Sequence, residues 1–178
     1  MSMPFRVLLT PLLLAAATVV GSAWLSRLPL PAVPDLVMLI VLSAGIRRGL
    51  ETGALLGAAG GYLRDLTSGG PLGLYTFVYV ILGTAAGSTM TVVNLNQRWV
   101  PTAAAAAATG LVYLTSGAVV AMTGVATVQW MPLIQSMVAA AALNALLARP
   151  LDGLVCWVDR IARRRYPAKA IGYRVPRA

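Results

Sequence analysis

The sequence predicts an all-α, polytopic integral membrane protein with about six transmembrane helices. Of its 178 residues, 58% are hydrophobic and only 11% are charged, and the mean hydropathy is +0.79. Soluble domains carry a charge at about a quarter of their positions. The charged residues lie between long apolar runs rather than within them, which is typical of membrane spans. At about 20 apolar residues per span with short connections, the length allows six crossings.

The first two apolar runs are separated by a proline-rich segment. Residues 7–25 are long enough to span, although a signal peptide is an alternative because small residues follow the apolar stretch. Residues 28–34 include three prolines and are expected to be extended. Residues 36–46 reach only about 16 Å as a helix, against about 30 Å of hydrocarbon. Either the extended segment completes the crossing, sheltered by other helices, or this run is a broken or re-entrant helix.

The third run carries glycines at helical spacing. In residues 50–66, glycine recurs at every fourth position and forms a smooth stripe on one helical face, which is expected to pack closely against another helix. The stripe consists of Gly53, Gly57 and Gly61. A turn over residues 67–73 follows, because its glycines tolerate positive φ and Pro71 suits a turn. The uncharged residues 72–93 then form a fourth, full span.

The last two spans are predicted at residues 100–122 and 131–148. Proline interrupts the hydrogen-bond ladder of a helix, so Pro150 is expected to end the sixth span. The chain is therefore divided into a six-helix transmembrane domain, residues 1–150, and a cytoplasmic tail, residues 151–178.

The tail is predicted to begin with an amphipathic helix over residues 151–165 that lies in the membrane interface. Asp152 and Asp159 on this helix are expected to be satisfied by solvent and by the helix dipole. Its basic end can approach anionic lipid headgroups, although a simple positive-inside anchor is an alternative. The residues concerned are Arg160, Arg163, Arg164 and Arg165.

Positive charge is distributed unequally between the two sides of the predicted membrane domain. Six crossings place both termini on one side, and with the N-terminus inside only Arg27 and Arg64 lie outside. Because Lys and Arg resist translocation, this asymmetry predicts a multi-pass inner-membrane protein with both termini in the cytoplasm. Topology also explains the net charge of +9, so nucleic acid is not an expected partner.

Composition excludes several kinds of chemistry. Histidine is absent and Cys156 is the only cysteine, so an intrachain disulfide, a Cys/His dyad and the usual zinc sites are ruled out. The predicted third to sixth spans carry no acidic residue at their centres, which a proton or ion relay would need. The sequence therefore predicts no catalytic residues, no metal and no cofactor.

A candidate site remains at the outer ends of the membrane segments. Asp35 and the adjacent Arg64 and Asp65 are ionisable groups in a place where charge is costly unless it is paired or hydrated. The structural alternative is that Arg64 or Arg27 neutralises Asp35 or Asp65 and braces two outer loops. The functional alternative is a recognition surface for a partner protein, since a glycine-rich turn exposes backbone groups that need partners. The surface would comprise Pro34, Asp35, Arg64, Asp65, Ser68, Gly69, Gly70, Pro71 and Gly73.

Five motifs together resemble the family of rod shape-determining protein MreD. They are VPDLV at 33–37, RRG at 47–49, GALLG at 53–57, DLTSGGPLGLY at 65–75 and RPLD at 149–152. The resemblance implies a non-enzymatic component of the bacterial elongation machinery that binds the single-span protein MreC. It further implies links to MreB, to RodA and to the transpeptidase partner of RodA. Such proteins are similar in fold to the substrate-binding subunits of energy-coupling-factor transporters, with six helices around an outward-facing cavity.

Two other functions are alternatives to a role in the elongation machinery. A vitamin-capturing subunit of an energy-coupling-factor transporter would need several convergent polar or aromatic side chains on the outer side. The outer loops are short and poor in such residues, which disfavours it. A lipid-modifying enzyme is the third alternative, and it would need convergent acids, bases or metal ligands.

Overall fold

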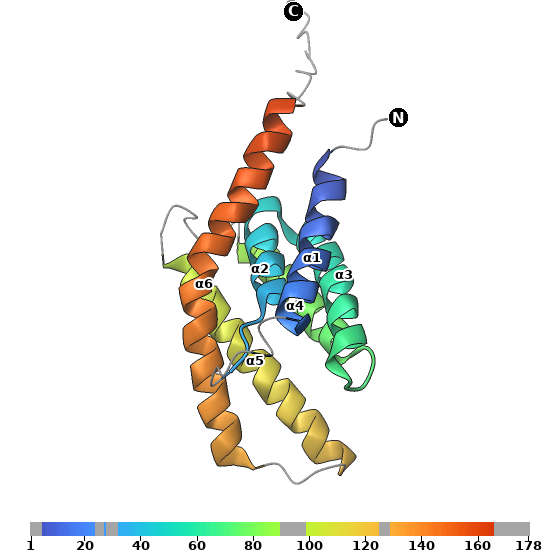
Figure 1. Ribbon diagram of the computed structural model, residues 1–178, viewed down its shortest axis with the longest axis vertical. Helices are drawn as coiled ribbons and strands as arrows, with labels where there is room; N and C mark the ends of the chain where they lie inside the picture. The colour runs from blue at the N-terminus through green and yellow to red at the C-terminus, as the bar shows by residue number, and fades with distance from the viewer. Residues whose placement is uncertain (1–4, 24–26, 28–31, 90–98, 125–128, 166–178) are drawn as a thin grey trace, which may run out of the picture.

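Six α-helices form the part of the chain that the structure, a computed structural model, describes (Figure 1). This part comprises residues 5–23, 27, 32–89, 99–124 and 129–165. The all-α fold class expected from the sequence is confirmed for these residues. In chain order the helices are α1 (Phe5–Ala23), α2 (Leu36–Arg48), α3 (Leu50–Ser68), α4 (Leu74–Ser88), α5 (Val100–Thr123) and α6 (Trp130–Arg165).

The outer surface of the helices is apolar. Within the described residues, Val100–Thr123 and Trp130–Ile161 are long and apolar enough to cross a membrane, and Leu9–Ala23 and Leu74–Ser88 are shorter apolar helices. Large apolar side chains also point outward along the bundle, among them Met122, which is 86% exposed. Soluble monomers rarely expose continuous apolar surface of this kind, whereas lipid covers it without cost. The number of crossings stays a prediction.

The short helix α2 lies at the centre of the bundle, where it contacts every other helix. Its residues from Val37 to Ile46 are all buried. Asp35 caps its first turn, because the carboxylate accepts a hydrogen bond from the Met38 amide at 3.1 Å. Residues 32–35 before it are not helical, and residues 28–31 of the proline-rich segment lie outside the described residues. The helix is thus as short as its apolar run predicts, and other helices shelter it.

Helices α3 and α4 approach each other along the glycine stripe. A Cβ atom added at Gly53 would collide with the Gly83 carbonyl oxygen, and one added at Gly57 would collide with the Tyr79 carbonyl oxygen. At Gly61 an added Cβ would lie 2.6 Å from the Tyr75 carbonyl oxygen. The face predicted to allow close helix packing therefore lies directly against the backbone of α4.

Helix α6 continues through Pro150 and ends at Arg165, a length of 36 residues (Figure 1). The expected helix end at residues 149–150 is therefore wrong. Proline removes one backbone hydrogen bond, but packing of α6 on the bundle outweighs this loss. Val155 and Val158 beyond the proline are 1% and 2% exposed. Both bury their side chains against the protein, whereas Leu154 in the same segment is exposed. The position of this segment in the membrane interface stays a prediction.

Ion pairs join the end of α2 to α6. Arg47 donates two hydrogen bonds to the Asp152 carboxylate, at 2.8 and 2.5 Å. Arg48 forms an ion pair with Asp159 at 3.0 Å and donates to the Thr10 hydroxyl of α1 at 2.8 Å. The expectation that solvent and the helix dipole satisfy Asp152 and Asp159 is therefore wrong. The beginning of α1 and the end of α6 lie toward this same end of the molecule (Figure 1).

Candidate functional site

The candidate site centres on Asp35 at the beginning of α2. Its carboxylate accepts a hydrogen bond from the hydroxyl group of Tyr79, a side chain of α4 with no exposed surface. The Nε atom of Arg64 in α3 lies 3.8 Å from the same carboxylate oxygen. The Arg64 guanidinium also lies 5.4 Å from the centre of the Tyr75 ring, within the range of a cation–π contact. Three helices thus bring one ion pair and two tyrosines together.

A second chain of hydrogen bonds connects this centre to α5 and α6. The side-chain oxygen of Asn144 accepts a hydrogen bond from the Asp35 amide at 2.8 Å. The Asn144 side-chain nitrogen donates to the Thr109 hydroxyl at 2.9 Å. Asn144 and Thr109 are 1% and 2% exposed, so both are satisfied polar groups inside an apolar bundle. Such a network fixes how α5 and α6 sit against α2.

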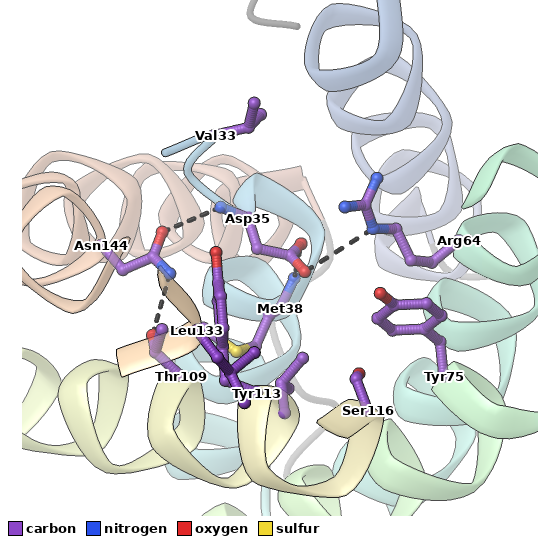
Figure 2. A pocket seen from close by; sticks show the side chains of 11 residues that line it. Val33, Asp35, Met38, Arg64, Tyr75, Thr109, Tyr113, Ser116, Leu133 and Asn144 are labelled. Atoms are coloured by element: carbon purple, nitrogen blue, oxygen red, sulfur yellow. Dashed lines mark hydrogen bonds and ion pairs between the residues drawn. The ribbon is translucent and has the colours of Figure 1, made fainter. Parts of the chain in front are cut away.

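Polar side chains of this network border a cavity of about 250 Å³ (Figure 2). Figure 2 shows that its labelled side chains come from segments far apart in the sequence and converge on one space. All helices from α2 to α6 contribute to the wall. The residues that line it are Val33, Asp35, Met38, Arg64, Tyr75, Thr109, Val112, Tyr113, Ser116, Leu133 and Asn144.

Asp65 is separated from this cavity and is 2% exposed. Its carboxylate accepts hydrogen bonds from the backbone amides of Tyr75 and Thr76, at 2.9 and 3.0 Å, and from the Thr76 hydroxyl at 2.5 Å. These amides belong to the first turn of α4, where a negative charge also meets the positive end of the helix dipole. Asp65 therefore acts as a cap for α4. Its carboxylate points into the protein rather than toward a partner.

The turn between α3 and α4 lies on the surface. Gly69 and Gly73 have φ of 67° and 96°, which glycine adopts without strain. Ser68 is half-buried, and the five residues from Gly69 to Gly73 are all exposed. Leu72 at the tip of the turn is 75% exposed.

The predicted site residues thus divide into three groups. Asp35 and Arg64 are brought together and border the cavity, Pro34 and Asp65 are buried, and the turn is exposed. Of the basic residues near the end of α6, Arg160 is exposed. The side chains of Arg163, Arg164 and Arg165 lie outside the described residues.

Sequence reasoning missed four residues of the site: Tyr75, Tyr79, Thr109 and Asn144. The signal for Asn144 was present, because an amide side chain in the middle of a long apolar span needs a partner inside the protein. Tyr79 gave no signal, since tyrosine is common in membrane helices and its partner Asp35 lies 44 positions away. Cross-helix partners of this kind depend on how helices are arranged, which a run of apolar residues does not specify.

The described side chains of the site offer groups that can bind a ligand or a partner. Its described residues contain no group of three His, Cys, Asp or Glu side chains that could hold a metal ion. The carboxylate of Asp35 is already engaged by a tyrosine hydroxyl and a backbone amide. The site presents the Arg64 guanidinium beside a small cavity, and an exposed turn of fixed geometry lies between α3 and α4.

Comparison with known proteins agrees with the motifs in the sequence. A family model described as rod shape-determining protein MreD matches residues 1–159. This range includes helices α1 to α5 and α6 as far as Asp159. No curated protein and no solved structure gives a significant match. Since the match extends over most of the chain, the protein belongs to the MreD family of membrane proteins that determine rod shape.

Proposed function

We propose that this protein is a non-enzymatic, multi-pass component of the bacterial inner membrane that binds MreC within the cell-elongation complex. In this role it helps to control cell shape and peptidoglycan synthesis. Membership of the MreD family supports this proposal at the level of cell shape. The contact with MreC is inferred from the surface that the bundle presents.

The exposed α3–α4 turn is the observation that carries the proposal. Its two ends are held from inside, by the glycine contacts of α3 with α4 and by the bonds from Asp65 to α4. Leu72 contributes little to the fold, because most of its surface is free. A rigid turn that exposes a leucine binds a partner at low entropic cost, because little freedom is lost on contact.

The turn also lies where a single-span partner would emerge. The arginine asymmetry places Arg47 and Arg48 in the cytoplasm, so the turn, at the other end of α3, is on the outer side. Arg64, in the last turns of α3, would then support the contact from behind. In this arrangement the MreC segment next to its span rests on the turn.

The end of the molecule at which α6 ends faces the cytoplasm in this proposal. Arg160 and the run Arg163 to Arg165 lie toward the end of α6, and we propose that they approach anionic lipid headgroups. MreB is reached from this side, whereas RodA and its transpeptidase are neighbours within the membrane. These contacts follow from the proposed orientation.

A pair of matched variants tests the proposal. Leu72→Ser removes an apolar side chain worth about 1.5–3 kcal/mol when buried by a partner, which corresponds to about tenfold weaker binding or more. Met122→Ser makes a similar change at a more exposed residue at the end of α5, toward the same end of the molecule. Tagged protein is co-expressed with MreC and purified in detergent, and the recovered MreC is measured for each variant.

The expected result is loss of MreC with Leu72→Ser and full recovery with Met122→Ser, at equal amounts of membrane protein. Cells that carry only the first variant should become round. Normal recovery of MreC with Leu72→Ser would show that the turn is not the contact.

A further inference from the structure

Three side chains on the wall of the cavity, those of Asp35, Asn144 and Thr109, already use their oxygen atoms in hydrogen bonds within the protein. The two carboxylate oxygens of Asp35 accept from the Met38 amide and from Tyr79. The Asn144 oxygen accepts from the Asp35 amide. The Thr109 hydroxyl accepts from Asn144 and donates to the Ala105 carbonyl oxygen at 2.7 Å. The protein itself therefore satisfies the acceptors on this wall.

The donors on the same wall are free. The Nε atom of Arg64 has no hydrogen-bond partner among the described residues, and its nearest carboxylate oxygen is 3.8 Å away. Within the described part of the chain, no hydrogen bond engages the hydroxyl groups of Tyr113 and Ser116, which also line the cavity. A guanidinium group in an apolar bundle is costly unless acceptors surround it. The cavity thus presents a cation and two hydroxyl groups that can donate hydrogen bonds to a bound acceptor.

The negative charge of Asp35 does not prevent the cavity from binding an anion. The Asp35 carboxylate accepts hydrogen bonds from the Tyr79 hydroxyl and from an amide in the first turn of α2. The helix dipole also favours an anion at this position. The guanidinium has five N–H donors in a planar fork, so it can bind an acceptor in the cavity while its Nε atom stays 3.8 Å from Asp35. Carboxylate and phosphate groups match this fork with two parallel hydrogen bonds.

We propose that the cavity binds one anionic group, a phosphate or a carboxylate, with Arg64 as its cationic contact and Tyr113 and Ser116 as hydroxyl donors. Its volume of about 250 Å³ is large enough for a phosphate or carboxylate group and the atoms attached to it. Val33, Val112 and Leu133 give the rest of the wall an apolar surface for a short attached chain.

Two sources could supply this group: a phospholipid headgroup from the bilayer, or a small soluble anion from the outer side. The purified full-length protein in detergent is therefore titrated separately with phosphatidylglycerol in mixed micelles and with inorganic phosphate. Diacylglycerol, which has no phosphate, is the control lipid. The thermal unfolding midpoint is followed, and native mass spectrometry counts the bound molecules.

A double variant removes the binding charge without leaving a buried charge alone. Arg64→Gln combined with Asp35→Asn eliminates both members of the ion pair. The matched control is Arg47→Gln combined with Asp152→Asn, which removes an ion pair at the other end of α2 and leaves the net charge of the protein equal. Tyr113→Phe is a milder variant that changes only one hydroxyl group in the cavity.

The unaltered protein and the control variant should show a saturable rise in midpoint with one molecule bound. The Arg64 and Asp35 double variant should need at least tenfold more ligand. A response to phosphatidylglycerol alone assigns the group to lipid, and a response to both ligands assigns it to a soluble anion. If the double variant does not fold, weaker binding by Tyr113→Phe supports the proposal. The absence of a saturable response in the unaltered protein, or an equal response in the cavity variants, overturns it.

Discussion

Replacing Gly57 by alanine tests the close packing of α3 on α4 with a single added carbon atom. That Cβ would collide with the Tyr79 carbonyl oxygen and lie 2.7 Å from the Tyr79 carbonyl carbon and 3.0 Å from the Val80 Cα. All three atoms belong to the backbone of α4, so no side-chain rotation relieves the contact. Ordinary van der Waals contact begins near 3.4 Å, so the two helices must separate by about 1 Å at the Tyr79 carbonyl oxygen.

The magnitude follows from two opposing effects. Overpacking a close interface costs about 1–3 kcal/mol, because the change must be absorbed along the whole contact. Alanine in a helix gains about 0.5–1 kcal/mol over glycine, which offsets part of this cost. We therefore expect Gly57→Ala to lower the free energy of unfolding by about 1–2 kcal/mol, or a midpoint decrease of several degrees at about 2–4 °C per kcal/mol.

Gly110→Ala is the matched control. Gly110 lies within α5, and a Cβ added there meets no atom within 4 Å. Thermal unfolding of both variants in the same detergent, followed by tryptophan fluorescence, should show a lower midpoint for Gly57→Ala only. Equal midpoints for the two variants would mean that α3 and α4 are not in backbone contact.

Three further outcomes are expected. An impermeant thiol reagent added to intact cells should label a cysteine introduced at Gly124 but not Cys156, and labelling of Cys156 would reverse the orientation. Asp65→Asn should lower the unfolding midpoint, because at least one donor at the beginning of α4 loses its acceptor at about 1–3 kcal/mol; an unchanged midpoint would contradict the capping role. Asn144→Leu should lower the unfolding midpoint by a similar amount, because the Thr109 hydroxyl loses a donor and the Asp35 amide loses its acceptor. Adding Thr109→Val to this variant should recover part of the loss.

The local features of the fold were predictable from the sequence because each is encoded by neighbouring residues. Glycine at every fourth position predicts a smooth helix face, and α4 lies against it. The run of eleven uncharged, mostly apolar residues before Arg47 predicts a helix too short to span, and α2 ends at Arg48. The glycines and proline of residues 67–73 predict a turn, and it separates α3 from α4.

Features that depend on tertiary contacts were not predictable in this way. Pro150 is a helix breaker by its own chemistry, and only the packing of Val155 and Val158 holds α6 continuous. Asp152 lies 105 positions from Arg47, so neither residue indicates its partner. The sequence left open whether Arg64 pairs with Asp35 or with Asp65. Successive residues of a helix point in different directions, and the structure shows the pair with Asp35.

The short central helix has a consequence for how the chain enters the membrane. At 13 residues α2 is about 20 Å long, and both of its ends carry charged residues, so it is a poor substrate for insertion as an independent segment. The surfaces that shelter it belong to α3, α4 and α6, which are synthesised later. We therefore expect α2 to wait at the translocation machinery until these helices have been made, and a chain truncated before α6 to be degraded rather than accumulated.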